Sequence, residues 1–153
     1  MSGLSHVNDR GEARMVDVAE REVTVRTAVA TGVVRTQAAD AISAGRVAKG
    51  DVLATARIAG IMAAKRTPEL IPMCHPIAIH GITVDLTVDE MTVRITATVR
   101  TADRTGVEME ALTAVSVAAL TIVDMTKSLD PAATITDIRV QTKSGGRSGD
   151  WTR

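Results

Sequence analysis

The 153-residue chain contains no phenylalanine and no tyrosine, and it has one tryptophan. Its hydrophobic core must therefore be built from Val, Ile, Leu, Ala and Met. These small side chains let helices and sheets approach closely, but each buries less area than an aromatic ring. A chain of this length fits one domain and buries roughly 70% of the surface of its unfolded chain. We therefore expect a thin aliphatic core that gains further burial by assembly with other subunits.

Charge and composition argue against several classes of protein. The 18 basic residues balance 18 acidic ones, whereas nucleic-acid-binding domains usually carry a basic surplus and aromatic side chains that stack on bases. The single cysteine cannot form an intrachain disulfide, and the N-terminal sequence has no apolar segment of a secretion signal. The longest apolar stretch, 111–123, is shorter than the ~20 residues of a membrane span. We therefore expect a cytoplasmic protein without nucleic-acid or membrane partners.

Hydrophobic periodicity divides the chain into strand-like and helix-like segments. Alternating runs rich in Val and Thr favour strands, and apolar residues at three- and four-residue spacing favour helices. Asp51 is a good N-cap, Thr36 could cap a short helix that ends at Gly45, and Pro68 would stop the second helix. Strands are expected at residues 22–34, 82–88, 91–99 and 133–141, and helices at 37–45, 51–66 and 107–129.

The resulting order is strand, helix, strand, strand, helix, strand. This βαββαβ order is that of the ferredoxin-like α+β fold, in which helices pack on one face of an antiparallel sheet. No internal repeat or linker divides the chain, so residues 1–153 are predicted to form a single domain. Residues 1–20 are polar and without periodicity, so they are expected to form a mobile or extended arm. Residues 143–153 form a Gly-rich C-terminal tail.

Two prolines, Pro72 and Pro76, bracket Met73, Cys74 and His75 in the segment LIPMCHPI. Prolines fix their own φ angles and restrict the residues before them, so this loop is held in few conformations. Such a loop suits contact with a ligand, and a stiff surface connection with a buried thiol is an equal alternative. No ligand pair at zinc spacing accompanies Cys74 and His75, so no structural metal is expected. As chain neighbours their side chains point apart, which disfavours a nucleophile–base pair.

The helix predicted at 107–129 carries acids at both ends. Glu108 and Glu110 lie in its first turn, where the helix dipole alone would explain them. Near its end, Asp124 and Lys127 are either an ordinary surface ion pair or a pair with shifted pKa values that exchanges protons with a substrate. Glu110 and Asp124 are 14 positions apart, or about 21 Å along a helix. A site that uses both is therefore long or is completed by a neighbouring chain.

Arginine supplies most of the 18 cationic residues, so the few lysines are either chance or sites that need a compact ammonium group. Lys49, before the second helix, is an anion contact or a solvated cap. Lys143 and Arg147 lie in KSGGRSGDW, whose backbone could approach a phosphate or be disordered. Arg26 in the first strand is a phosphate contact or a charge on the sheet face. The lysines are Lys49, Lys65, Lys127 and Lys143.

Four segments carry a resemblance when they are taken together: GEARMVDV, KGDVLATARIAGIMAAKRTPELIPMCHPI, TGVEMEALTAVSVAALTIVDMTKSLD and KSGGRSGDW. In this order and spacing they closely resemble the cyclic pyranopterin monophosphate synthase family, the C proteins of early molybdenum-cofactor biosynthesis. The resemblance extends over nearly the whole chain and is weakest in residues 28–44 and 82–102. All four lysines lie in or beside these segments.

The resemblance implies a ferredoxin-like subunit in a homohexamer, a trimer of dimers, with the site at a subunit interface. It implies a phosphorus–oxygen lyase that converts 3′,8-cyclo-7,8-dihydro-GTP into cyclic pyranopterin monophosphate and releases pyrophosphate. No cofactor is firmly implied, although a divalent cation could accompany the triphosphate. The competing class is a non-enzymatic nucleotide-binding regulatory module with the same fold, which would bind nucleotide without forming product.

The resemblance also implies a role for each matched residue. Asp124 takes the position of the catalytic acid/base, with Lys127 beside it. We expect this pair to be buried, to have displaced pKa values and to transfer protons, while His75 and Glu110 hold the base-derived part of the substrate. Cations could surround the triphosphate. Those cations are Lys49, Lys143, Arg26 and Arg147, and the substrate-binding positions are Met73, Cys74, His75, Met109, Glu110, Lys49, Glu108, Lys143 and Arg26.

Overall fold

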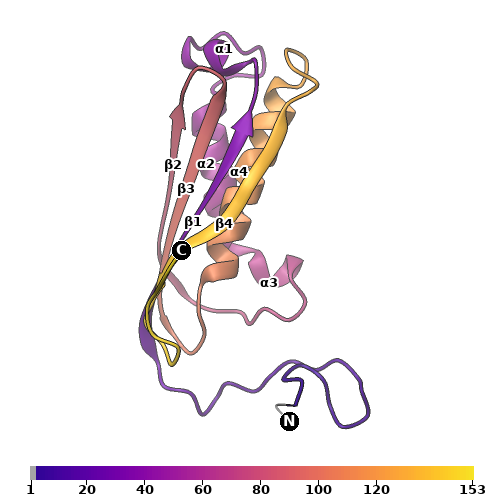
Figure 1. Ribbon diagram of the computed structural model, residues 1–153, viewed down its shortest axis with the longest axis vertical. Coiled ribbons are helices and arrows are strands. Elements are labelled where there is room, and N and C mark those ends of the chain that lie inside the picture. The colour runs from indigo at the N-terminus through magenta and orange to yellow at the C-terminus, as the bar shows by residue number, and fades with distance from the viewer. Residues whose placement is uncertain (1–2) are drawn as a thin grey trace.

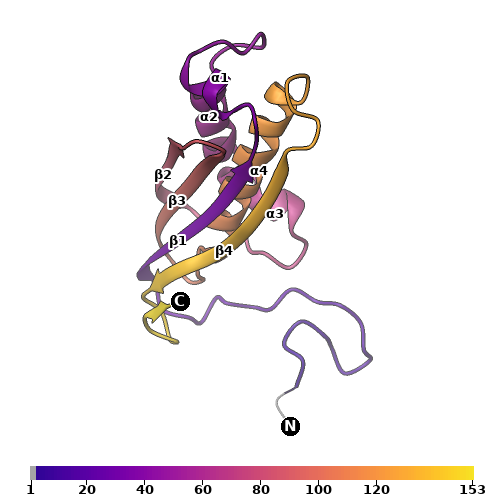
Figure 2. The ribbon, with the colours of Figure 1, turned by 45° about the horizontal axis from the view of Figure 1, so that its top comes forward.

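The structure is a computed structural model that describes residues 3–153. Its elements are β1 (Thr24–Arg35), α1 (Ala39–Ser43), α2 (Val52–Lys65), α3 (Thr67–Leu70), β2 (Ile79–Val88), β3 (Thr92–Asp103), α4 (Glu108–Thr126), β4 (Thr134–Ser144) and β5 (Trp151–Thr152). The strands form one antiparallel sheet in the order β2-β3-β1-β4-β5. The long helices α2 and α4 pack against each other on one face of this sheet (Figures 1 and 2). This is the ferredoxin-like α+β arrangement that the sequence predicts.

The core is as thin and aliphatic as the missing aromatics imply. Its buried hydrophobic residues are Ala, Val and Ile, with Met125 as the one larger flexible side chain among the described residues. Two glycines let the layers approach closely. A Cβ on Gly32 of β1 would lie 2.6 Å from Val115 of α4, and a Cβ on Gly60 of α2 would lie 2.9 Å from the carbonyl oxygen of Ala114. Small residues therefore set the spacing between α4, α2 and the sheet.

Helix α4 is the central element of the helical layer. It has the length and apolar composition that could cross a membrane, but 56% of its 18-residue apolar window is buried inside the protein. Its apolar residues pack on β1, β3, β4 and α2. The apolar character of α4 is therefore explained by its place in the core.

Local signals predict the helix boundaries with mixed success. Asp51 caps α2 as expected, because its side chain accepts a hydrogen bond from the Ala54 N–H at 3.0 Å. The expectation that Thr36 caps α1 is wrong, since the N-cap is Ala38. Helix α2 ends at Lys65, and Pro68 lies in the first turn of the separate helix α3. This is a position that proline tolerates, because the first-turn N–H groups have no partner within a helix.

Several strands are longer than the side-chain alternation indicates. β2 begins at Ile79 rather than at 82, β3 continues to Asp103 rather than to 99, and β4 continues to Ser144 rather than to 141. These added residues are paired across the sheet, for example Ile79 with Thr101 and Ser144 with Thr27. Backbone hydrogen bonds between strands hold them, and such bonds leave no signature in side-chain polarity.

The two terminal segments lie at the same end of the molecule. Residues 3–23 contain no helix or named strand, only an isolated bridge between Val7 and Ala13, and they extend from the body as an arm (Figures 1 and 2). Residues 1 and 2 of the predicted arm lie outside the described residues. The Gly-rich tail folds back, because Trp151 of β5 pairs with Lys143 of β4.

Candidate functional site

The residues that the sequence singles out gather at the two ends of α4. At its first turn lie Glu108 and Glu110, with Cys74 and Lys143 in contact with them; we call these four residues the N-terminal cluster. At its last turns lie Asp124 and Lys127, with Lys49 in contact; we call these three the C-terminal cluster. Each end of α4 therefore carries acidic and basic side chains that the sequence singles out.

In the C-terminal cluster one carboxylate bridges two ammonium groups. Lys127 Nζ donates to Asp124 Oδ1 at 2.9 Å, as the i, i+3 spacing predicts. Lys49 Nζ donates to Asp124 Oδ2 at 3.1 Å and to the Asp124 carbonyl oxygen at 3.0 Å. Lys49 comes from the turn before α2, 75 positions earlier in the chain. The fold, rather than local spacing, completes this arrangement.

The expectation that the Asp124–Lys127 pair is buried is wrong for a single chain. The side chains of Asp124 and Lys127 are 58% and 61% exposed, because they point outward from the end of α4 and no other element of the described chain covers them. Hydrogen bonds from Lys127 and Lys49, together with their charges, hold the pKa of Asp124 below its ordinary value. Asp124 is therefore ionised at neutral pH and can act as a proton acceptor.

The N-terminal cluster has the opposite character. Glu110 is 1% exposed although the sequence allows it to be only a helix-dipole acid. Cys74 Sγ donates to Glu110 Oε1 at 3.4 Å, and Oε2 has no hydrogen-bond partner among residues 3–153. Burial raises the pKa of Glu110. A buried oxygen without a partner is costly and indicates a place where a ligand donor would bind.

Cys74 is a hydrogen-bond donor rather than a nucleophile in this arrangement. Burial raises the pKa of its thiol to about 12, and the nearby charge of Glu110 contributes to the same shift. His75 points elsewhere, since its Nε2 hydrogen-bonds to the carbonyl oxygen of Val16 on the N-terminal arm. The expected divergence of the two neighbouring side chains is therefore confirmed.

A small cavity of about 210 Å³ adjoins Glu108, Lys143 and Arg26. Lys143 Nζ lies 3.5 Å from Glu108 Oε1 and donates to Ser148 Oγ at 3.1 Å. The backbone of the tail packs closely against Arg26: a Cβ added to Gly146 would lie only 2.5 Å from the Arg26 guanidinium. The Gly-rich segment thus brings its backbone against a cation that the sequence predicts as a phosphate contact.

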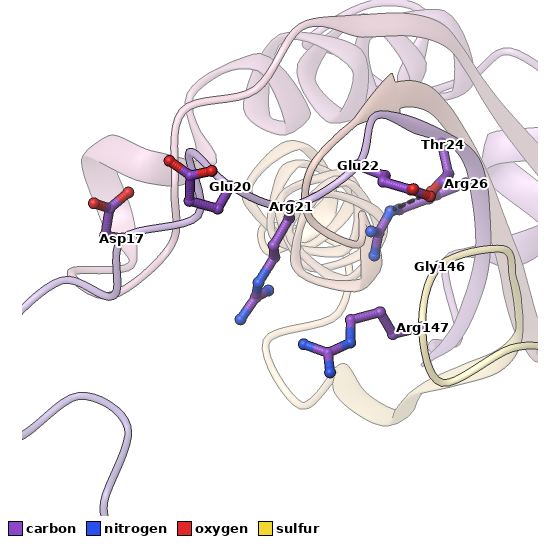
Figure 3. A pocket seen from close by; sticks show the side chains of 8 residues that line it. All are labelled: Asp17, Glu20, Arg21, Glu22, Thr24, Arg26, Gly146 and Arg147. Carbon is purple, nitrogen blue, oxygen red and sulfur yellow. Dashed lines mark hydrogen bonds between the residues drawn. The ribbon is translucent and has the colours of Figure 1, made fainter.

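A larger cavity of about 640 Å³ opens between the arm and the turn of the tail. In Figure 3, Arg21 of the arm and Arg147 of the turn extend into the same opening, beside Arg26. Arg21 and the arm acids are functional candidates without a signal in the sequence, because the arm shows no periodicity and its pattern predicts only an extended segment. The lining residues are Asp17, Glu20, Arg21, Glu22, Thr24, Arg26, Gly146 and Arg147.

The remaining predicted residues occupy less informative positions. Met73 and Met109, next in sequence to Cys74 and Glu110, are 38% and 37% exposed. Across residues 3–153 the structure contains no group of three or more His, Cys, Asp or Glu side chains arranged to hold a metal ion. The Asp130-Pro131 pair indicates only a helix stop in the sequence, yet Asp130 is a buried acid with several hydrogen bonds.

Comparison with known proteins is unambiguous. The family model described as the MoaC family matches residues 15–146, which include both clusters. A cyclic pyranopterin monophosphate synthase of Streptomyces coelicolor is 61% identical over 98% of this chain and 89% of its own length. Cyclic pyranopterin monophosphate synthase 2 of Mycobacterium tuberculosis (strain H37Rv) is 62% identical over 98% of this chain and 91% of its own. The corresponding protein of Roseiflexus sp. (strain RS-1) is 58% identical over 99% and 98%.

Proposed function

The chain belongs to the MoaC family, and we propose that it converts 3′,8-cyclo-7,8-dihydro-GTP into cyclic pyranopterin monophosphate and releases pyrophosphate. It is an enzyme of molybdenum cofactor biosynthesis, a lyase that acts on a small nucleotide-derived substrate. The observation that carries the mechanism is the Asp124 carboxylate held between the ammonium groups of Lys49 and Lys127. Ring opening and closure need proton donors and acceptors in one place, and this cluster supplies both.

Proton transfer is assigned to the C-terminal cluster. Ionised Asp124 accepts a proton from the substrate, and Lys127 donates a proton to the ring that opens or closes. Substrate or a neighbouring subunit that covers Asp124 would raise its proton affinity, because loss of water disfavours the charged form. The exposed cluster of the single chain then becomes a site that can both take up and return a proton.

Recognition of the base-derived ring is assigned to the N-terminal cluster. The unpartnered Oε2 of Glu110 can accept a hydrogen bond from an N–H on the ring, while Cys74 holds the other oxygen. Lys143 and Arg26 border the adjacent cavity and supply positive charge for the phosphates. Cations around a triphosphate stabilise the charge that develops as pyrophosphate leaves. A divalent cation that accompanies the triphosphate stays a prediction.

The separation of the clusters supports a site shared between subunits. Glu110 and Asp124 stand 14 positions apart on one continuous helix, or about 21 Å, which a nucleotide-sized substrate does not span while contacting both. The N-terminal cluster of one subunit would face the C-terminal cluster of the next in a homohexamer, a trimer of dimers. Exposed apolar side chains on the long helices, Ile58, Met62 and Leu120, support such assembly, since they are 60%, 48% and 57% exposed.

The experiment incubates the purified protein with the cyclised GTP intermediate and assays pyrophosphate and the pterin product. Formation of both, at a rate that depends on Asp124, is the expected result. Reversible nucleotide binding without product, unaffected by Asp124→Asn, would favour the regulatory module instead.

Subunit mixing tests the shared site. Asp124→Asn and Glu110→Gln subunits, each with strongly reduced turnover at a substrate concentration below the wild-type KM, are unfolded together and refolded as a mixture. If every site takes one cluster from each of two randomly assembled subunits, about a quarter of the sites regain both intact clusters. A mixture that is no more active than the two variants assayed separately, although mixed oligomers form, would assign both clusters to a single chain.

A further inference from the structure

The segment 36–50 leaves the sheet after β1, contains α1 and returns to the body at α2. Both of its ends contact the same end of α4. Near its start, Thr36 and Gln37 donate hydrogen bonds to Asp130. Near its other end, Lys49 donates to Asp124. The segment is therefore attached to α4 by two acids, six positions apart in the chain.

The first of these acids is buried and satisfied at both oxygens. Asp130 is 6% exposed, and its Oδ2 accepts from Thr36 Oγ1 at 2.9 Å and from the Gln37 N–H at 2.8 Å. Its Oδ1 accepts from the Ala132 N–H at 3.1 Å. These hydrogen bonds, the one from Gln37 first, lower the pKa of Asp130. Hydrogen bonds to an ionised acceptor are stronger than neutral ones, so this contact is a firm attachment.

Asp130 is also fixed to α4 through its backbone. Its N–H donates to the Thr126 carbonyl oxygen at 3.0 Å, and the Leu129 N–H donates to the same oxygen at 2.9 Å. Thr126 is completely buried at the end of α4. The carboxylate of Asp130 therefore has a defined position relative to the turn that carries Asp124 and Lys127.

The second acid makes a weaker attachment. The side chains of Lys49 and Asp124 are 50% and 58% exposed, and exposed ion pairs contribute little to holding flexible chains in one geometry. The helix α1 packs against β2, and Ile42 and Val47 of the segment join the hydrophobic core. The position of Lys49 therefore depends on how the rest of the segment is anchored. Asp130 supplies its buried charged anchor, beside the hydrogen bond from the Thr36 N–H to the Met91 carbonyl oxygen at 2.9 Å.

We propose that Asp130 is a positioning residue for the reaction: its carboxylate anchors the segment 36–50 to the end of α4 and so holds Lys49 against Asp124. The proposal rests on the proposed function, in which Asp124 exchanges protons with the substrate. Asp130 itself touches no substrate, because its oxygens are occupied by Thr36, Gln37 and Ala132. Its effect on turnover passes through the Lys49–Asp124 contact.

The first test is the Asp130→Asn substitution, which keeps the size of the side chain but removes its charge and one acceptor oxygen. The carboxyl carbon of Asp124 is titrated by NMR in the protein without substrate. Among the described residues, the charged groups that face Asp124 are Lys49 and Lys127. With Lys49 released, the pKa of Asp124 should rise toward its value in a Lys49→Met reference. An unchanged titration would overturn the proposal.

The second test measures turnover in a double-mutant cycle. Asp130→Asn should lower kcat about tenfold, less than the roughly hundredfold loss that a 1 Å misplacement of a catalytic group can cause. In the Lys49→Met background it should change kcat less than about twofold, because the two losses share one contact. Equal losses in both backgrounds would mean that Asp130 acts on the fold alone, which contradicts the proposal.

A control separates positioning from stability. Thr31→Val removes the 2.7 Å hydrogen bond from Gln141 on the sheet, far from either cluster in the chain, and it should leave the Asp124 titration unchanged. If Asp130→Asn does not fold, Thr36→Val removes one of the same hydrogen bonds and should produce a smaller shift in the same direction. A shifted titration with unchanged turnover would uphold the Asp130 anchor and contradict the proton-transfer role of Asp124.

Discussion

Glu110 and Asp124 lie on one helix, yet the pKa values of their carboxyl groups are shifted in opposite directions. Glu110 is buried beside Cys74 and its pKa is raised, whereas Asp124 is exposed between Lys49 and Lys127 and its pKa is lowered. The helix dipole opposes this difference, because it favours an ionised acid at the start of the helix and disfavours one at its end. The two environments come from other segments that the fold brings to each end.

This difference fits the two chemical tasks that we propose for the ends of α4. At the N-terminal cluster, exclusion of water makes one carboxyl oxygen available to a ligand at a cost to the stability of the unliganded chain. At the C-terminal cluster, paired charges keep a carboxylate ionised and accessible until something covers it. One end is suited to recognition and the other to proton transfer.

The largest effect should follow from removing the charge at the C-terminal cluster. Asp124→Asn keeps the shape of the side chain but cannot accept the proton, so kcat should fall about a thousandfold, within the range for loss of a general acid or base. The matched control is Asp85→Asn, since Asp85 is an exposed acid on β2 outside both clusters. The control should turn over at the wild-type rate, and near wild-type turnover by Asp124→Asn would refute the assignment.

The next effect concerns thiol reactivity at the N-terminal cluster. With a pKa of about 12, Cys74 should react with an aromatic disulfide reagent at pH 8 roughly fiftyfold more slowly than an ordinary cysteine, after allowance for the greater nucleophilicity of a more basic thiolate. Glu110→Gln should accelerate the reaction, because it removes a nearby negative charge, while Asp124→Asn should not. If the thiol of the wild type reacted as fast as an ordinary cysteine, the conclusion that Cys74 is desolvated would be wrong.

Much of this arrangement could be predicted from sequence, and the rest could not for a physical reason. The βαββαβ order follows from periodicity, and the Asp124–Lys127 contact follows from i, i+3 spacing on a helix. The Lys49–Asp124 contact joins residues 75 positions apart, and the Thr36–Asp130 contact joins residues 94 apart. Side-chain patterns within a short window carry no information about such pairs.

Burial was the least predictable property of the acids. Glu110 looks like an ordinary first-turn acid, and its burial depends on the loop that places Cys74 against it. Asp124 follows an apolar run, which favours burial, yet its side chain is 58% exposed in the single chain. The sequence shows which residues are acidic, but the exposure of each acidic side chain depends on tertiary packing.

The third prediction, of intermediate size, concerns both substrate binding and stability at the N-terminal cluster. Glu110→Gln should raise KM about tenfold, the scale of one hydrogen bond to a charged group. Because the native pKa of Glu110 is raised by burial, the native state binds its proton more tightly than the unfolded state. The free energy of unfolding of the wild type therefore falls as pH rises from the unfolded value through the native one, and the variant lacks this decline.

Melting temperatures between pH 4 and pH 8 measure this linkage. The melting temperature of the wild type minus that of Glu110→Gln should decrease steadily with rising pH. Glu90→Gln, at an exposed acid in the turn between β2 and β3, is the control and should give a constant difference. A constant difference for Glu110→Gln as well would mean that Glu110 is solvated in the folded protein.

The smallest effect tests whether the two ends of α4 are independent. Asp51 caps α2 two positions after Lys49, and Asp51→Ala should lower the free energy of unfolding by about 1 kcal/mol. Asp51→Asn keeps an acceptor oxygen for the Ala54 N–H and should lose less than half as much. Neither variant should alter the reactivity of Cys74, because the cap lies at the end of the molecule that carries the C-terminal cluster. A changed thiol reaction rate in Asp51→Ala alone would show that strain at one cluster is transmitted to the other, and the recognition and proton-transfer ends would then be one coupled unit.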